Sequence, residues 1–179
     1  NNTSPELSIE DVQICEGEVI LLSSVNIIDN NSAIGTISYH TNLPANDFNE
    51  ITNLSISPSS STVYYVLKIT EDDCEDTELF TVFVTPTPII NAGVDFAVCG
   101  LMATLNGISS VNNNSWISDN ITFTDVSSLT TGVESSVYGS QVVTLNAEEN
   151  GCEASPEQLS ITFLEIPTAN AGVDIDICT

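Results

Sequence analysis

Positive charge is almost absent from this sequence. Among its 179 residues Lys68 is the only lysine and there is no arginine, whereas 25 residues are aspartate or glutamate, which gives a formal net charge of −24. Binding to nucleic acid depends on lysine and arginine side chains that neutralise phosphates, and attraction to an anionic membrane surface depends on the same side chains. We therefore expect neither nucleic acid nor an anionic membrane surface as a partner.

Several features of enzymes and membrane proteins are also missing. No apolar run approaches the roughly 18 residues of a membrane-spanning helix, so we expect no direct insertion into a membrane. There is one histidine, His40, no Cys-x-x-Cys pair and no glycine-rich phosphate loop. A single histidine at a strand end is typical of a surface or edge residue, and Lys68 is expected at the surface too. These absences argue against an enzyme.

What the sequence does contain is a succession of short β-strand patterns. β-branched and aromatic residues fill 62–70 and 79–84, on either side of an acidic turn, and predict a hairpin. Residues 141–145 and 158–164 repeat this plan around the polar turn 148–152. Shorter strands are expected at 18–22, 35–39, 102–105 and 121–123. Because no window has an apolar period of 3.6 residues, the prediction is an all-β fold of the β-sandwich type.

A nine-residue segment occurs twice. Residues 91–99, Asn-Ala-Gly-Val-Asp-Phe-Ala-Val-Cys, return 79 positions later as residues 170–178, Asn-Ala-Gly-Val-Asp-Ile-Asp-Ile-Cys. A repeat at the interval of a small domain is typical of a tandem array, and proline-containing connectors at 85–88 and 165–168 mark the joints. We therefore predict a first repeat over 1–87, a second over 88–167 and the start of a third, truncated repeat over 168–179.

The five cysteines suggest an oxidising compartment. Cys15 and Cys99 each stand near the start of a predicted repeat, and Cys74 and Cys152 each stand in the turn of its last hairpin. Because this placement occurs twice, the sequence predicts one disulfide within each repeat, Cys15 with Cys74 and Cys99 with Cys152. Cys178 is then the first cysteine of the third repeat; a reactive thiol or an intermolecular bridge is the alternative for it.

Calcium is the one cofactor that the sequence suggests. Asp72, Asp73 and Asp76 crowd into a single turn, and Asp95 and Asp174 each follow a connector. Ca²⁺ takes six to eight oxygen ligands, which carboxylates supply well where no positive charge competes. No loop of the EF-hand type is present, however, and Asp95 and Asp174 each stand two residues after a glycine, where an aspartate can simply cap a turn. Calcium binding and turn capping are both kept as interpretations.

Trp116, the only tryptophan, has two interpretations. It could offer a flat surface on which a sugar ring stacks, or it could be the core tryptophan that is common on a central strand of a sandwich. The second interpretation is favoured, because a tryptophan in a β-sandwich is more often a core residue than a ligand contact.

The repeated segment resembles a known type of repeat. Residues 88–95, 99–100 and 103–107, with the partial copy at 167–178, resemble the opening of immunoglobulin-like and PKD-like repeats in giant surface adhesins of gliding and marine Bacteroidetes. The signature of that opening is Pro-x-Ala-Asn-Ala-Gly-x-Asp-x-x-x-Cys. The resemblance covers nearly the whole chain, and it departs at Val94 and Val173, where the family often has proline, and at the first repeat, which lacks the Asn-Ala-Gly element.

The resemblance carries expectations about fold and function. It implies tandem immunoglobulin-like β-sandwich domains, export by the type 9 secretion system, and display at the extracellular cell surface. We therefore expect a stalk segment of an adhesin that projects binding regions and transmits traction during surface attachment or gliding. Its partners would be neighbouring repeats of the same chain, surface polysaccharide, or the secretion and gliding machinery. The alternatives are a polysaccharide-binding module and a passive spacer in a secreted multidomain hydrolase.

Overall fold

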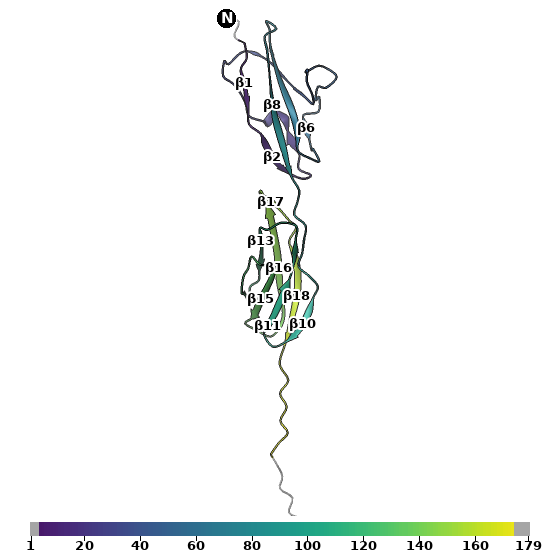
Figure 1. Cartoon of the computed structure of the whole chain (residues 1–179), viewed down its shortest axis with the longest axis vertical. Coiled ribbons are helices and arrows are strands. Elements are labelled where there is room, and N and C mark those ends of the chain that lie inside the picture. Colours follow the sequence, from purple (N-terminus) through teal and green to yellow (C-terminus); the bar gives the residue numbers. More distant parts are fainter. Residues whose placement is uncertain (1–3, 174–179) are drawn as a thin grey trace, which may run out of the picture. The chain divides into compact units, whose positions relative to one another are not determined.

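The computed structural model describes residues 4–173 and is built from β-strands (Figure 1). The predicted all-β fold is confirmed. Among the described residues the helical segment is a single 3-10 turn, η1 (Leu22–Ser24), and no helix there has the length and apolar character needed to cross a bilayer.

The chain divides into two compact units. Unit 1 comprises Asn1–Thr87 together with the short segment Glu149–Cys152, and unit 2 comprises Pro88–Glu148 and Glu153–Thr179. The predicted third repeat, 168–179, lies partly outside the described residues, because 174–179 are not described.

Unit 1 is organised around a four-stranded sheet with the order β2-β8-β7-β5. Its strands are β2 (Val12–Cys15), β8 (Glu75–Thr85), β7 (Thr62–Thr70) and β5 (Gly35–His40). β7 and β8 form the predicted hairpin, although β8 begins at Glu75, earlier than expected. Strand β2 runs parallel to β8, whereas the other neighbours are antiparallel. Two small pairs complete the unit, β1 (Leu7–Ile9) with β4 (Ile27–Asp29) and β3 (Ile20–Leu21) with β6 (Ser55–Ile56).

Unit 2 has a corresponding sheet with the order β10-β18-β16-β13, and β17 pairs with β16 at its side. These strands are β10 (Phe96–Cys99), β18 (Glu157–Leu164), β16 (Gly139–Glu149), β13 (Asn114–Ile117) and β17 (Cys152–Glu153). A second sheet has the order β11-β15-β14, with β11 (Met102–Asn106), β15 (Thr130–Ser135) and β14 (Ile121–Phe123). β9 (Ile90–Asn91) pairs with β12 (Ile108–Ser109).

This strand order is that of an immunoglobulin-like sandwich. One sheet contains the last hairpin flanked by the third main strand, and the opposite sheet contains the second, fifth and fourth main strands. In unit 2 the first main strand, β10, runs parallel to the last, β18, from Phe96 beside Ile161 to Cys99 beside Leu164. The predicted immunoglobulin-like fold is therefore confirmed.

Each unit has its own hydrophobic core. In unit 2 the alternation along β18 turns Leu159, Ile161 and Phe163 inward, where they pack with Leu145 and Trp116. In unit 1 the fully buried side chains include Leu22, Val66, Phe80 and Val82. The two cores explain why the sequence shows the same strand plan twice.

Candidate functional site

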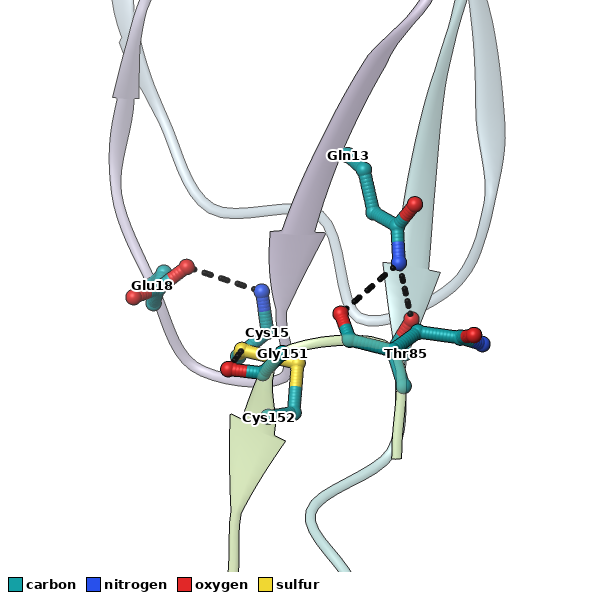
Figure 2. Close-up of a disulfide and its surroundings, with 7 residues drawn as sticks. Gln13, Cys15, Glu18, Thr85, Gly151 and Cys152 are labelled. Atoms are coloured by element: carbon teal, nitrogen blue, oxygen red, sulfur yellow. Dashed lines mark hydrogen bonds between the residues drawn. A yellow bond between two sulfur atoms is a disulfide. The ribbon is translucent and has the colours of Figure 1, made fainter. Parts of the chain in front are cut away.

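The disulfide joins Cys15 to Cys152, at a Cα–Cα distance of 5.5 Å and a sequence separation of 137 residues (Figure 2). Both cysteines belong to unit 1, because Glu149–Cys152 groups with it. The last residue of β16, Glu149, is part of that segment, whereas the rest of β16 and all of β18 belong to unit 2. Among the described residues Cys74 and Cys99 are free thiols. Cys178 lies outside the described residues.

The predicted bond between Cys15 and Cys74 is therefore wrong. Because β2 runs parallel to β8, Cys15 lies beside Thr85, the last residue of β8. Cys74 comes immediately before the first residue of the same strand. Eleven residues of extended chain span roughly 35 Å, whereas the Cα atoms of a disulfide lie within about 7 Å of each other.

The predicted bond between Cys99 and Cys152 is wrong for the same reason. Cys99 lies beside Leu164, the last residue of β18, while Cys152 precedes the start of that strand. The eight residues of β18 alone span roughly 23 Å. The prediction missed that the two cysteines of each proposed pair stand at opposite ends of the last strand.

Hydrogen bonds surround the Cys15–Cys152 bond within unit 1. The Gln13 side chain donates through Nε2 to the carbonyl oxygen of Asn150 at 3.1 Å and to Oγ1 of Thr85 at 3.2 Å. Figure 2 shows Gln13 and Thr85 beside the disulfide. The backbone N–H of Cys15 donates to Oε2 of Glu18 at 2.8 Å. Cys152 is 2% exposed. The bond is thus held in a specific setting and is shielded on the Cys152 side.

An aspartate stands four residues before the strand-end cysteine in both units. The backbone N–H of Thr81 donates to Oδ1 of Asp11 at 2.6 Å, and the N–H of Ser160 donates to Oδ1 of Asp95 at 2.8 Å. In each case the contact lies one residue before the parallel strand pair begins. Sequence reasoning missed Asp11, although its spacing to Cys15 equals the spacing of Asp95 to Cys99.

The calcium candidates are dispersed among structural contacts. Asp76 accepts a hydrogen bond from the N–H of Leu7 at 2.7 Å, and Asp95 accepts the one from Ser160. Asp72 and Asp73 are exposed in the turn, and Asp174 lies outside the described residues. No group of three or more His, Cys, Asp or Glu side chains suited to a metal ion occurs in the described part of the chain. Calcium binding remains a prediction, and Asp95 has a capping contact of its own.

Trp116 is a core side chain. It is 1% exposed, and its indole Nε1 donates to the carbonyl oxygen of Ser128 at 3.1 Å. The indole therefore offers no open face to a sugar ring.

His40 is buried, so its expected position at the surface is wrong, although it ends β5, an edge strand of its sheet. It is 2% exposed, its Nε2 lies 2.8 Å from Oγ of Ser38, and its Nδ1 lies 2.9 Å from Oδ1 of Asn49. Serine, histidine and an orienting side chain also stand in this order in hydrolases, but here the imidazole is closed to a substrate. The network instead holds the loop that follows β5, since the N–H of Thr41 also donates to the Asn49 carbonyl.

Lys68 is also buried, which corrects its expected place at the surface. Its Nζ lies 2.8 Å from Oδ2 of Asp29, and the two side chains are 11% and 9% exposed. The Lys68 ammonium is the largest cause that holds the pKa of Asp29 well below its usual range, and the backbone N–H of Glu6 is the next. The only lysine of the chain therefore serves an internal ion pair.

Comparison with known proteins gives distant structural likeness only. No family model and no curated protein matches the chain. Among solved structures, murine CEACAM1b is 15% identical, with 90% of this chain and 100% of that chain covered and a TM-score of 0.41. DIP-gamma IG1+IG2 is 13% identical, with 90% and 98% covered and a TM-score of 0.44. The fibronectin(III)-like modules of Clostridium thermocellum CbhA are 10% identical, with 94% and 100% covered and a TM-score of 0.41. Likeness at this level does not identify a function.

Proposed function

We propose that this chain is a force-transmitting stalk segment of an extracellular adhesin, displayed on a bacterial cell surface. In this role it projects binding regions and transmits traction during surface attachment or gliding. The observation that supports the proposal is the disulfide between Cys15 and Cys152, which encloses most of the chain in one covalent loop. The sequence resemblance to adhesin repeats supports the bacterial surface and export by the type 9 secretion system.

The covalent loop changes how the chain responds to tension. A force applied to the two ends enters the loop at Cys15 and leaves it at Cys152, so the S–S bond carries the load past the residues between them. Those residues cannot be drawn out even when their hydrogen bonds break. A module that only binds a ligand gains little from such a loop, whereas a segment that is pulled gains a fixed maximum length.

The surface chemistry fits an extracellular array. A net charge of −24 makes copies of the chain repel one another and keeps them soluble, and a disulfide persists in an oxidising environment. Neighbouring repeats of the same chain are the proposed partners, with the secretion and gliding machinery as further ones. We propose no enzymatic activity.

The two alternatives have less support. The polysaccharide-binding module depended on Trp116, whose indole is buried. The passive spacer in a secreted hydrolase differs from the adhesin in the domains that accompany the chain, and it has no need for a loop that limits extension.

Attachment under flow tests the proposal. Cells that display the protein with both Cys15→Ser and Cys152→Ser should attach in still medium as wild-type cells do, but should detach at lower shear, because the load then unfolds the modules. The matched control is Ser59→Ala, at an exposed position of the enclosed segment, which leaves every cysteine in place. The amount of displayed protein is measured with an antibody in every strain. Equal retention under shear would contradict the proposed role, and loss of attachment in still medium would favour a direct role in binding.

A further inference from the structure

The free thiols Cys74 and Cys99 stand at the same places relative to their neighbouring strands as the bonded cysteines Cys152 and Cys15. Cys99 is exposed at the end of β10, and Cys74 is half-buried in the turn between β7 and β8. Cys15 ends β2, and Cys152 follows the turn after β16. A bond is therefore already made in this chain between one cysteine of each kind.

Cys99 is the counterpart of Cys15 by three separate contacts. Each cysteine is the last residue of a strand parallel to the last strand of its sheet, beside Leu164 and Thr85 respectively. Each follows, at the same spacing, an aspartate that accepts a hydrogen bond from that last strand. The N–H of the next residue donates to the same partner, from Glu16 to the Thr85 carbonyl at 2.9 Å and from Gly100 to the Leu164 carbonyl at 2.8 Å.

Cys74 is the counterpart of Cys152 by the backbone of its turn. Each follows the first strand of the last hairpin, β7 or β16, and precedes the second strand of that hairpin, β8 or β18. The residue directly before each cysteine has a positive φ, 58° at Asp73 and 82° at Gly151. This left-handed residue turns the chain in the same way before both sulfur atoms.

We propose that Cys99 and Cys74 are halves of the same bond, made with other repeats of this type. The rule set by Cys15 and Cys152 is that a strand-end cysteine bonds with a turn cysteine further along the chain, 137 residues later in this case. Cys99 accordingly takes the turn cysteine of a further repeat, and Cys74 takes the strand-end cysteine of a preceding one. The partner in both cases is a thiol on a module with the same fold.

The chemistry is an ordinary thiol–disulfide exchange with a low-molecular-weight disulfide such as oxidised glutathione. The Cys99 thiolate attacks the glutathione disulfide and releases one glutathione thiolate. The turn cysteine then attacks the Cys99 sulfur in the mixed disulfide and releases the second. Two protein thiols are oxidised by two electrons, one glutathione disulfide is reduced to two glutathione molecules, and the two protons go to the released thiolates.

Successive bonds of this kind would overlap along the chain. Cys99 lies within the segment that Cys15 and Cys152 enclose, so the next loop would begin before the previous one ends. An array built in this way has a covalent path that bypasses the folded modules at every step. This bonding goes beyond the proposed adhesin role, because it requires only consecutive repeats and no particular ligand.

An extended chain tests the bonding rule. A second copy of residues 88–179 is joined after residue 166, which keeps the natural interval because Pro167 corresponds to Pro88 in the repeated segment. The chain carries Cys74→Ser, and the added copy carries Cys99→Ser and Cys178→Ser. The first copy ends at residue 166 and therefore lacks Cys178. Four cysteines remain, which are Cys15, Cys99 and the Cys152 of each copy. The tether supplies a high local concentration. After oxidation in a glutathione buffer, non-reducing peptide mapping should find Cys15 bonded to the first Cys152, Cys99 bonded to the Cys152 of the added copy, and no thiol open to alkylation.

The matched control is the same extended chain with Cys99→Ser in the first copy, which should leave one alkylated thiol, the Cys152 of the added copy. Recovery of Cys99 as an alkylated thiol, in protein that has formed the Cys15 to Cys152 bond, would overturn the proposal. So would a bond from Cys99 to any other cysteine.

A second measurement does not depend on folding of the added copy. Full-length chains carrying Cys74→Ser and Cys178→Ser are mixed with isotope-labelled chains carrying Cys99→Ser and Cys178→Ser, so that one population has Cys99 and the other has Cys74. Disulfide-linked heterodimers should make up nearly all of the dimers, against the half that random pairing would give. A statistical distribution, or an excess of either homodimer, would contradict a specific pairing of the two sites.

Discussion

At the scale of single residues, the only lysine of the chain is placed where it compensates a buried carboxylate. Asp29 accepts hydrogen bonds from Lys68 and from the backbone N–H groups of Glu6, Asn31 and Ala33, all at 2.8–3.0 Å. These donors favour the ionised carboxylate and hold its pKa well below the usual range, with Lys68 as the largest cause. Asp29 thereby ties β4 to β7 and to the loop that follows β4.

This ion pair should make the stability of unit 1 depend on pH, so that unit 1 is less stable in acid. An aspartate in the unfolded chain takes up a proton near pH 4, whereas Asp29 in the folded chain does so only at lower pH, so the unfolded state binds more protons as the pH falls. The stabilisation is therefore complete above about pH 5 and is lost towards pH 2. Asp29→Asn should lower the midpoint of thermal unfolding at pH 7, and the difference from wild type should shrink as the pH falls to 2.

Circular dichroism melts at several pH values measure this dependence. Asp47→Asn, at an exposed aspartate of the same unit, is the matched control and should leave the curve unchanged. A difference between Asp29→Asn and wild type that stays constant from pH 7 to pH 2 would show that ionisation of Asp29 does not stabilise the fold.

At the scale of elements, the strands β2 and β10 are the distinctive parts of the two units. Each begins just after an aspartate that binds the last strand, and each ends in a cysteine beside the terminal residue of that strand. A parallel pair at the edge of a sheet lacks the tight turn that sets the register of a hairpin. The aspartate supplies a fixed starting point in its place, and it thereby determines where the cysteine lies.

Removal of that starting point should weaken unit 2 measurably. Asp95→Ala deletes the acceptor for the Ser160 N–H and should lower the free energy of unfolding by about 1 kcal/mol, the typical contribution of such a hydrogen bond. Asp95→Asn keeps an acceptor oxygen and should retain most of that stability. Urea unfolding measures both variants, with Asp119→Ala at an exposed position as the control. Equal losses in the alanine and asparagine variants would argue against the capping contact.

The acidic turn between β7 and β8 provides the test of calcium binding. An ion held by Asp72, Asp73 and Asp76 would stabilise the folded state by mass action, so millimolar calcium should raise the melting midpoint of chelator-treated protein by several degrees. Asp72→Asn with Asp73→Asn should abolish that rise, and magnesium serves as the comparison ion. A midpoint that is the same with chelator and with calcium would reject calcium as a cofactor at this turn.

At the scale of the whole molecule, the disulfide decides how much of the chain can be extended. In the oxidised protein the residues enclosed by Cys15 and Cys152 stay off the path of the force, whereas in the reduced protein they are all on it. The same loop restricts the unfolded state, which the chain-entropy model values at about 5 kcal/mol for a loop longer than 100 residues.

Single-molecule stretching should reveal the loop directly. With the chain held at its two ends, reduction should add roughly 45 nm to the extension on complete unfolding, since the enclosed residues contribute about 3.4 Å each. The double variant Cys15→Ser and Cys152→Ser should give the long extension without reduction, and Cys99→Ser should behave as wild type. The same extension before and after reduction would show that no such loop exists.

The sequence by itself determined the parts of this protein that depend on local pattern. Alternation and β-branched residues predicted the hairpin strand Thr62–Thr70 and the closing strand of the second hairpin, because each depends on side chains that are near in sequence. The buried place of Trp116 was predicted from the tryptophan that is common in the core of a β-sandwich, and it is confirmed. The immunoglobulin-like class came from a resemblance in the repeated segment and was confirmed by the strand order.

Only the tertiary structure decided which residues meet across long intervals. Asp29 and Lys68 are 39 positions apart, and neither side chain has a local pattern that names its partner. The cysteine partners depend on a parallel pairing between the first and last strands of a sheet, whose register no turn dictates. The symmetry of the sequence suggested one bond inside each repeat. Because the first strand runs parallel to the last, the two cysteines of each predicted bond lie at opposite ends of the last strand. Cys15 bonds with Cys152 instead.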